Sequence, residues 1–153
     1  MTNKLGSSNP NRIPKLKNKK LKKIDLDKQK NIYDLIKHAL EAQKNSKCKF
    51  SNFAVGCSLL CDDGTVIYGT NIESAAYPST LCAERVAIYS ALSNGHTKFK
   101  AIAIVSDNGA KPCGSCRQII HEYLKNIPIY ISDSVGKKYT IHYINDLLPY
   151  PFG

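Results

Sequence analysis

Residues 82–106, CAERVAIYSALSNGHTKFKAIAIVS, decide the fold of this chain. Apolar residues recur at helical spacing from residue 82 to 92, and Asn94-Gly95 supplies the left-handed conformation in which many helices end. The run at 100–106 is apolar at almost every position, as in a strand with both faces buried. A helix followed by a fully buried strand predicts an α/β protein with helices on the faces of a sheet.

The flanking sequence extends this pattern in both directions. An amphipathic helix is expected at about 28–45, capped by Asp25 or Asp27, and Asp62-Asp63-Gly64-Thr65 predicts the turn of a β-hairpin. The other expected elements are strands at 53–61 and 66–70, a helix at 113–125, strands near 127–131 and 138–143, and a short helix at about 145–148. Together they predict a three-layer α-β-α sandwich with a five-stranded mixed sheet.

Length and composition limit the classes of protein to be considered. With 153 residues, the chain is long enough to form one domain with a core that needs no disulfides. It has no run of about 18 apolar residues and no secretion signal, so we expect no membrane association and a cytoplasmic protein.

The basic charge is concentrated at the N-terminus. Residues 1–30 hold ten of the 22 Lys and Arg residues and two of the 12 acidic ones, so +8 of the net charge of +10 lies there. We expect residues 1–24 to be a disordered basic tail and residues 25–153 to form the folded domain. The lysines at 15–23 could bind nucleic acid or direct nuclear entry, although such a run is more often a solvated tail.

Two cysteine motifs predict a catalytic zinc site. Cys82-Ala83-Glu84-Arg85 and Pro112-Cys113-Gly114-Ser115-Cys116 together offer three thiolates and one carboxylate. A structural zinc usually has four protein ligands, whereas a catalytic zinc keeps one position open for water. We therefore expect Cys82, Cys113 and Cys116 to bind one Zn²⁺ per subunit. Glu84, next to the first ligand but not among the ligands, is suited to carrying protons.

Three thiolates on Zn²⁺ leave a formal charge of −1, which weakens the ion as a Lewis acid. Arg85 comes three residues after Cys82 and Arg117 directly follows Cys116, and a guanidinium that donates to a thiolate would withdraw charge from it. Arg85 is the preferred candidate. Helix N-termini also stabilise thiolates, and both motifs are expected to begin helices.

The remaining cysteines and the histidines are expected to be structural. Cys57 and Cys61 have the even spacing of one strand face, and with Cys48 we interpret them as buried thiols, with a second zinc site as the alternative. His38, His96, His121 and His142 have no suitable local partner and are expected to be structural or surface residues.

These motifs resemble those of the small, homotetrameric cytidine deaminases. The resemblance runs from about residue 32 to 152, through several ordered motifs at the spacing of that family. The motifs are Phe50-Ser51-Asn52-Phe53-Ala54-Val55-Gly56, Asn71-Ile72-Glu73-Ser74-Ala75-Ala76-Tyr77-Pro78, Cys82-Ala83-Glu84-Arg85, Pro112-Cys113-Gly114-Ser115-Cys116-Arg117-Gln118 and Leu147-Leu148-Pro149.

The resemblance implies hydrolytic deamination of cytidine and 2′-deoxycytidine in pyrimidine salvage. It implies zinc ligation by the three cysteines, and a Glu84 that carries the water proton to ring N3 and then to the departing ammonia. The implied substrate-binding residues are Asn71 and Glu73 for the ribose, Phe53 for the pocket wall, the Ala83 backbone for the pyrimidine edge, Tyr77 in the nucleoside-binding loop, and Phe152 reaching the pocket of a neighbouring subunit.

Three alternatives stay open at this point. A deaminase of a modified cytosine nucleoside such as blasticidin S is disfavoured by Glu73, since that relative lacks the ribose-binding carboxylate. A nucleic-acid cytosine deaminase would use the basic tail, but recognition of a free 3′-hydroxyl excludes a continuing polymer. A redox or structural Cys-x-x-Cys protein would account for Cys113 and Cys116 but not for Cys82 and Glu84.

Overall fold

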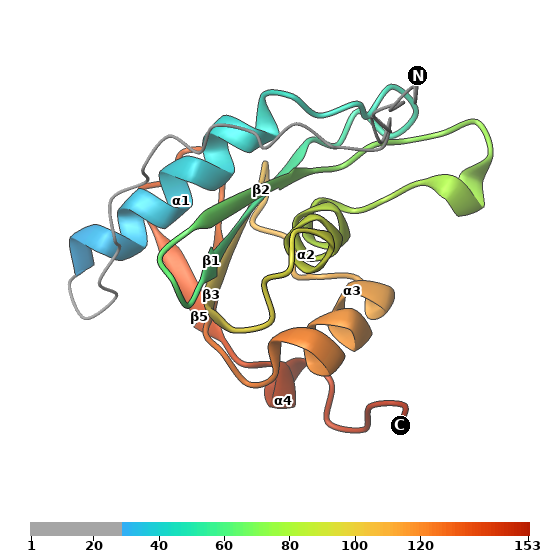
Figure 1. Cartoon of the computed structure of the whole chain (residues 1–153). Helices are drawn as coiled ribbons and strands as arrows, with labels where there is room; N and C mark the ends of the chain where they lie inside the picture. Colours follow the sequence, from blue (N-terminus) through green and yellow to red (C-terminus); the bar gives the residue numbers. More distant parts are fainter. Residues whose placement is uncertain (1–28) are drawn as a thin grey trace, which may run out of the picture.

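The computed structural model describes residues 29–153 (Figure 1). The predicted tail at 1–24, the domain boundary at residue 25, and the caps Asp25 and Asp27 lie outside the described residues. The elements, in chain order, are α1 (Gln29–Gln43), β1 (Val55–Cys61), β2 (Val66–Thr70), a 3₁₀ turn (Tyr77–Ser79), α2 (Ala83–Ser93), β3 (Phe99–Ser106), α3 (Gly114–Ile119), a π-helical turn (Ile120–Leu124), β4 (Ile129–Ser132), β5 (Tyr139–His142) and α4 (Ile144–Leu147).

The five strands form one mixed sheet in the order β2-β1-β3-β4-β5. β1 pairs antiparallel with both β2 and β3, β4 pairs antiparallel with β5, and β3 and β4 are parallel. The parallel pair requires a crossover, which α3 and the π-helical turn supply. The predicted five-stranded mixed sheet is confirmed.

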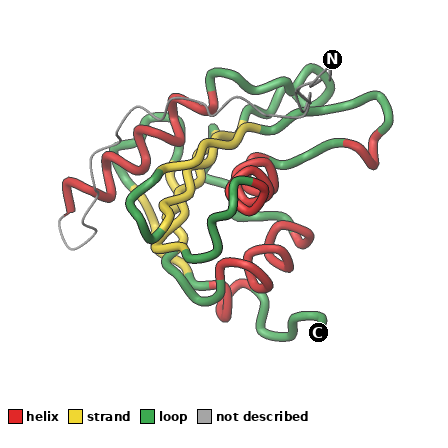
Figure 2. The backbone as a smooth tube through the Cα atoms, viewed as in Figure 1, coloured by secondary structure: helices red, strands yellow, loops and turns green. Residues whose placement is uncertain are grey.

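Helices cover both faces of this sheet, as Figures 1 and 2 show: α1 lies on one side, and α2, α3 and α4 lie on the other. Alternate residues of the strands divide between the two layers, because successive side chains of a strand point to opposite faces. Leu59 and Ile102 pack in the α2 layer, whereas Leu60 and Ala101 pack beneath α1. The predicted three-layer α-β-α sandwich is confirmed.

Two glycines allow helices to approach the sheet closely. A Cβ at Gly56 would lie 2.0 Å from the carbonyl oxygen of Ala39 in α1, and one at Gly69 would lie 2.1 Å from that of Ala83 in α2. The second contact matters for the site, because Ala83 is in the first turn of α2. β2 therefore fixes the position of that turn.

Some boundaries differ from those expected. The helix predicted at 113–125 is α3 followed by the π-helical turn, and it ends at Lys125, where φ is 58°. The first strand begins at Val55 and not at residue 53, because the Asn71 side chain bonds the Phe53 carbonyl and the Val55 N–H. Within residues 29–153, no helix is long and apolar enough to cross a membrane.

Candidate active site

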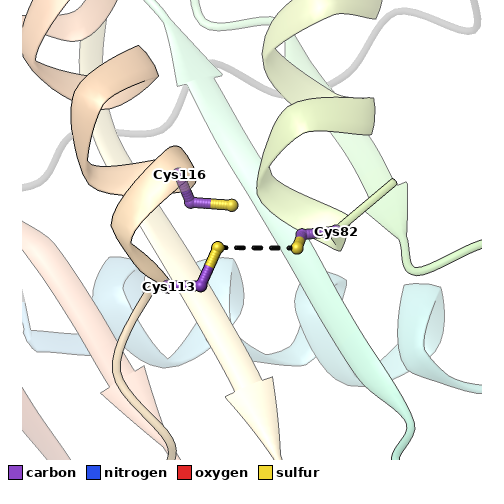
Figure 3. A group of neighbouring side chains, drawn as sticks. All are labelled: Cys82, Cys113 and Cys116. Atoms are coloured by element: carbon purple, nitrogen blue, oxygen red, sulfur yellow. Dashed lines mark hydrogen bonds between the residues drawn. The ribbon is translucent and has the colours of Figure 1, made fainter. Parts of the chain in front are cut away.

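The three predicted zinc-binding thiols lie together, where the N-termini of α2 and α3 meet (Figure 3). Cys82 and Cys113 are the extended N-cap residues of these two helices, and Cys116 is in the first turn of α3. The three Sγ atoms lie within 4.8 Å of one another, and those of Cys82 and Cys113 are 3.8 Å apart. Two sulfurs bound at about 2.3 Å to one tetrahedral zinc ion are about 3.8 Å apart, so the group fits zinc.

The thiols are also prepared electrostatically for a cation. The neighbouring Cys116 thiol first, and then Arg85 and Cys113, lower the pKa of Cys82 to about 5. Proximity to Cys82 and burial raise the pKa of Cys116, and a metal ion that binds a thiol displaces its proton. The lowered pKa of Cys82 favours the thiolate, which is the form that binds metal.

Of the two arginines that follow cysteines, Arg85 is the one that reaches a thiol. Its Nη2 lies 3.8 Å from Cys82 Sγ and donates to the Thr80 carbonyl at 3.0 Å, while its Nε is buried without a hydrogen-bond partner in the described part of the chain. Arg117 instead donates to the carbonyls of Pro112 and Leu147, at 2.8 and 3.0 Å. The positive charge beside the thiols therefore comes from Arg85.

Glu84 lies in the first turn of α2 and is only 4% exposed. Its side chain lines a pocket of about 240 Å³, together with Cys82 and Cys113. Burial raises the pKa of the Glu84 carboxyl to about 7. A carboxyl with a pKa near neutrality is suited both to accepting and to donating a proton.

The rest of the pocket combines an apolar wall with a polar rim. Phe53, Asn71 and Glu73, predicted from the sequence to bind substrate, all line it. The other lining residues are Ser51, Val55, Thr80, Leu81, Ile104, Ser106, Ala110 and Lys111.

Glu73 is fixed at the rim as a carboxylate. It accepts hydrogen bonds from the backbone N–H groups of Phe50 and Ser51, at 2.7 and 3.2 Å, and from the Ser51 hydroxyl. The Ser51 hydroxyl is the main cause of the lowered pKa of Glu73. These three bonds leave acceptor capacity on the carboxylate for a further donor.

Asn71 is 8% exposed and mainly shapes the pocket. Its Oδ1 accepts from the Ser46 hydroxyl at 2.6 Å and from the Val55 N–H at 2.9 Å, and its Nδ2 donates to the Phe53 carbonyl at 2.8 Å. An amide nitrogen carries two hydrogens, so one of them remains for a ligand.

The other predicted binding residues are placed differently. Ala83 is fully buried at the start of α2, so only its backbone is suited to a ligand. Tyr77 is 74% exposed and lies outside the pocket. Its ring packs edge to face against the ring of Phe50, with 6.2 Å between the two ring centroids. Phe152 is 88% exposed and lines a separate groove of about 670 Å³ with His121. The single chain therefore does not bring Tyr77 and Phe152 into the pocket.

Among the pocket residues that were not expected from the sequence, Ser51 and Lys111 add a hydrogen bond and a charge to the site. Ser51 is part of the Phe50–Gly56 motif, but nothing in that motif shows that its hydroxyl bonds a carboxylate 22 positions further along the chain. Lys111 stands next to Pro112-Cys113 and brings a positive charge to the rim. Its position directly before the Pro112-Cys113 motif could have indicated from the sequence that it lies near the site.

Comparisons with known proteins agree with this geometry. The family described as "Cytidine and deoxycytidylate deaminase zinc-binding region" matches residues 29–130. The cytidine deaminase of Sporosarcina psychrophila is 40% identical over 109 residues, covering 69% of this chain and 80% of that protein. The cytidine deaminase of Halalkalibacterium halodurans is 40% identical over 121 residues, covering 77% of this chain and 91% of that protein.

Solved structures give the same result. The crystal structure of cytidine deaminase from Burkholderia pseudomallei superimposes with a TM-score of 0.75 at 36% identity, covering 78% of this chain and 98% of that one. The chain belongs to the cytidine and deoxycytidylate deaminase family, a family of zinc-dependent hydrolases.

Proposed function

We propose that this protein deaminates cytidine and 2′-deoxycytidine to uridine and 2′-deoxyuridine, with release of ammonia, in pyrimidine salvage. One observation carries the proposal: the buried Glu84 lines one pocket together with Phe53, Glu73 and two of the three converging thiols, Cys82 and Cys113. The relatives named as cytidine deaminases support the choice of substrate.

Cys82, Cys113 and Cys116 would hold the zinc, since their Sγ atoms lie within 4.8 Å of one another. When bound, zinc supplies Lewis acidity that lowers the pKa of water to about 7. Arg85 contributes by donating to Cys82 Sγ, which offsets part of the negative charge of three thiolates.

Glu84 carries the protons of the reaction. It takes a proton from the attacking water and delivers it to N3 of the cytosine ring, while a bond forms between the water oxygen and C4. It then passes the second water proton to the amino group, and the bond from C4 to nitrogen breaks with loss of ammonia. Water and cytidine thus give uridine and ammonia, and Glu84 returns to its starting state.

The pocket residues position the nucleoside. Glu73 would accept a hydrogen bond from the ribose 3′-hydroxyl, and Asn71 would donate its remaining N–H to the ribose. Phe53 would lie against the nucleoside, and the Ala83 backbone would hold the pyrimidine edge. Tyr77, in the loop before α2, would cover the bound nucleoside from outside.

The test is the ultraviolet assay of cytidine conversion by the wild type and Glu84→Gln, with zinc measured in both. We expect kcat to fall by about 10²–10⁴-fold, the usual contribution of a positioned proton carrier, with no change in zinc content. Glu41→Gln is the matched control, because Glu41 lies on the surface of α1 and pairs with Lys44 at 2.6 Å. A folded, zinc-loaded wild type without activity on cytidine or 2′-deoxycytidine would refute the substrate assignment.

We further propose a cytoplasmic homotetramer in which Phe152 completes the pocket of a neighbouring subunit. In this proposal residues 25–153 are the catalytic domain and the basic residues 1–24 are dispensable for catalysis. Deletion of residues 1–24 should leave kcat and KM for cytidine unchanged. Loss of deamination on deletion, or editing of single-stranded nucleic acid by the full chain, would contradict this division.

A further inference from the structure

A second group of potential metal ligands lies at the opposite end of the sheet from the active site. It consists of Cys61, the last residue of β1, Asp63 in the hairpin turn, and His96 in the loop between α2 and β3. β1 begins at the active-site pocket with Val55 and ends with Cys61, so the two groups are separated by on the order of 20 Å along the strand. None of the three residues has a part in the proposed deamination.

The three side chains converge on one point. One potential ligand atom from each lies within 4.8 Å of the other two, and His96 Nδ1 is 3.7 Å from Asp63 Oδ2. Cys61 is 1% exposed, whereas the side chains of His96 and Asp63 are 22% and 58% exposed. The group therefore has a buried floor formed by the thiol and an opening to solvent at the carboxylate.

The backbone holds the carboxylate and the thiol in place. Cys61 N–H donates to the Thr65 carbonyl at 2.8 Å, and Gly64 N–H donates to the Cys61 carbonyl at 3.0 Å. Asp63 Oδ1 accepts from Thr65 N–H at 2.9 Å, which leaves Oδ2 directed toward His96. The hairpin turn thus carries both the thiol and the carboxylate of the group.

The loop with His96 is tied to the same turn. His96 N–H donates to the Ala91 carbonyl at 3.0 Å, after Gly95 ends α2 with a φ of +86°. Asp62 N–H donates to the Lys98 carbonyl at 2.9 Å, which joins the turn to the loop. The nearby ammonium of Lys100 is held by Asp62, with 3.6 Å to its carboxylate and 2.8 Å to its carbonyl oxygen, so Asp63 keeps its charge for another partner.

We propose that Cys61, Asp63 and His96 bind a second zinc ion. Thiolate, imidazole and carboxylate are the three donor types that zinc takes in proteins. One thiolate and one carboxylate balance the two positive charges of the ion, so this site needs no compensating arginine. The ion would join the β1–β2 hairpin to the α2–β3 loop and stabilise the folded chain, with water as its fourth ligand.

An ion pair between His96 and Asp63 is the simpler use of these residues, and pairs of this kind near the surface contribute little to stability. The ion pair gives no role to the third member of the group, the Cys61 thiol. Metal stoichiometry separates the two interpretations, because an ion pair takes up no zinc.

The experiment is zinc titration of the full chain in the presence of a competing chelator, with bound metal measured by mass spectrometry. The wild type should bind about two zinc ions per chain, and His96→Ala and Asp63→Asn about one. Asn at position 63 retains the oxygen that accepts from Thr65 N–H, so the turn is preserved. Asp62→Asn, which changes the neighbouring carboxylate, is the matched control and should still bind two.

Two further readouts keep the test independent of the proposed deamination. Addition of the second equivalent of zinc should raise the Tm of the wild type and of Asp62→Asn but not that of His96→Ala. Deamination of cytidine should be unchanged in His96→Ala, because the active-site group is intact. A wild type that binds one zinc, or a second zinc that persists in both His96→Ala and Asp63→Asn, would overturn the proposal.

Discussion

At the scale of single residues, the active site depends on charges placed beside the thiols. Three thiolates around Zn²⁺ carry a net charge of −1, and the Arg85 guanidinium is the group that contacts one of them, at 3.8 Å from Cys82 Sγ. The pKa of Cys82, lowered to about 5, reflects hydrogen bonds from Cys116 and then from Arg85. In the proposed zinc site, Arg85 would therefore adjust the charge of the Cys82 ligand.

Arg85→Gln should lower zinc affinity or kcat by about 10–100-fold, the usual cost of removing a partner of a metal ligand. Arg85→Lys should lower zinc affinity or kcat by a smaller factor. Lysine keeps the positive charge and lacks only the planar guanidinium that also donates to the Thr80 carbonyl. Zinc competition against a chelator and the ultraviolet assay measure the two quantities. Equal losses in both variants would mean that Arg85 acts through packing and not through charge.

Ser51→Ala should raise KM for cytidine about tenfold with kcat nearly unchanged. The Ser51 hydroxyl orients Glu73 and is the main cause of its lowered pKa. Loss of a hydrogen bond to a charged group typically corresponds to about tenfold in affinity. Steady-state kinetics separate KM from kcat, and Ser134→Ala, a surface hydroxyl bonded to Asp107, is the control. A fall in kcat alone would contradict a binding role for Glu73.

At the scale of the secondary-structure elements, close packing of β2 on α2 positions the first turn of α2. Gly69 lies against the backbone of Ala83. Ala83 stands in the sequence between Cys82 and Glu84. A side chain at position 69 would push the start of α2, with Cys82 and the proposed proton carrier Glu84, away from the sheet.

Gly69→Ala should therefore destabilise the protein by about 3 kcal/mol, at the upper end of overpacking costs, because its Cβ would lie 2.1 Å from the Ala83 carbonyl oxygen. Urea unfolding measures the change in the free energy of unfolding. Gly114→Ala is the control, since its Cβ meets nothing within 4 Å and should change stability by less than about 0.5 kcal/mol. Equal stability of the two variants would show that β2 does not fix α2.

Most elements follow from the sequence because their patterns are local. The apolar run that becomes β3 and the Asp-Gly turn between β1 and β2 each contain their own signal. The start of the first strand has no such local signal, because it depends on the side chain of Asn71, 16 positions after Val55. The π-helical turn after α3 likewise has no local signal in the sequence.

The residues of the candidate site also differ in whether a local sequence signal predicts them. The thiols and Glu84 could be predicted, because two short motifs hold all four residues and zinc chemistry dictates their spacing. The bond between Ser51 and Glu73 could not, because it joins a loop to a segment 22 positions away. The group of Cys61, Asp63 and His96 was missed for the same reason: His96 comes 35 positions after Cys61, and only the fold brings them together.

At the scale of the whole molecule, the C-terminal segment presents aromatic rings to solvent. Tyr150 and Phe152 are 91% and 88% exposed. The backbone of Phe152 is nevertheless fixed, because the Gln118 amide donates to its carbonyl at 2.7 Å and accepts from its N–H at 3.0 Å. A ring held in solvent by an anchored backbone is suited to insertion into another subunit, as in the proposed tetramer.

Sharing of sites between subunits predicts complementation. Phe152→Ala and Glu84→Gln should each be far less active than the wild type, one lacking the ring and the other the proton carrier. When the two are unfolded and refolded together, some pockets combine Glu84 of a Phe152→Ala subunit with Phe152 of a Glu84→Gln subunit. Activity in the ultraviolet assay should then exceed that of either variant refolded alone, at a mass of about four chains by light scattering. A mixture no more active than the sum of its separately refolded components would mean that each chain builds its pocket alone.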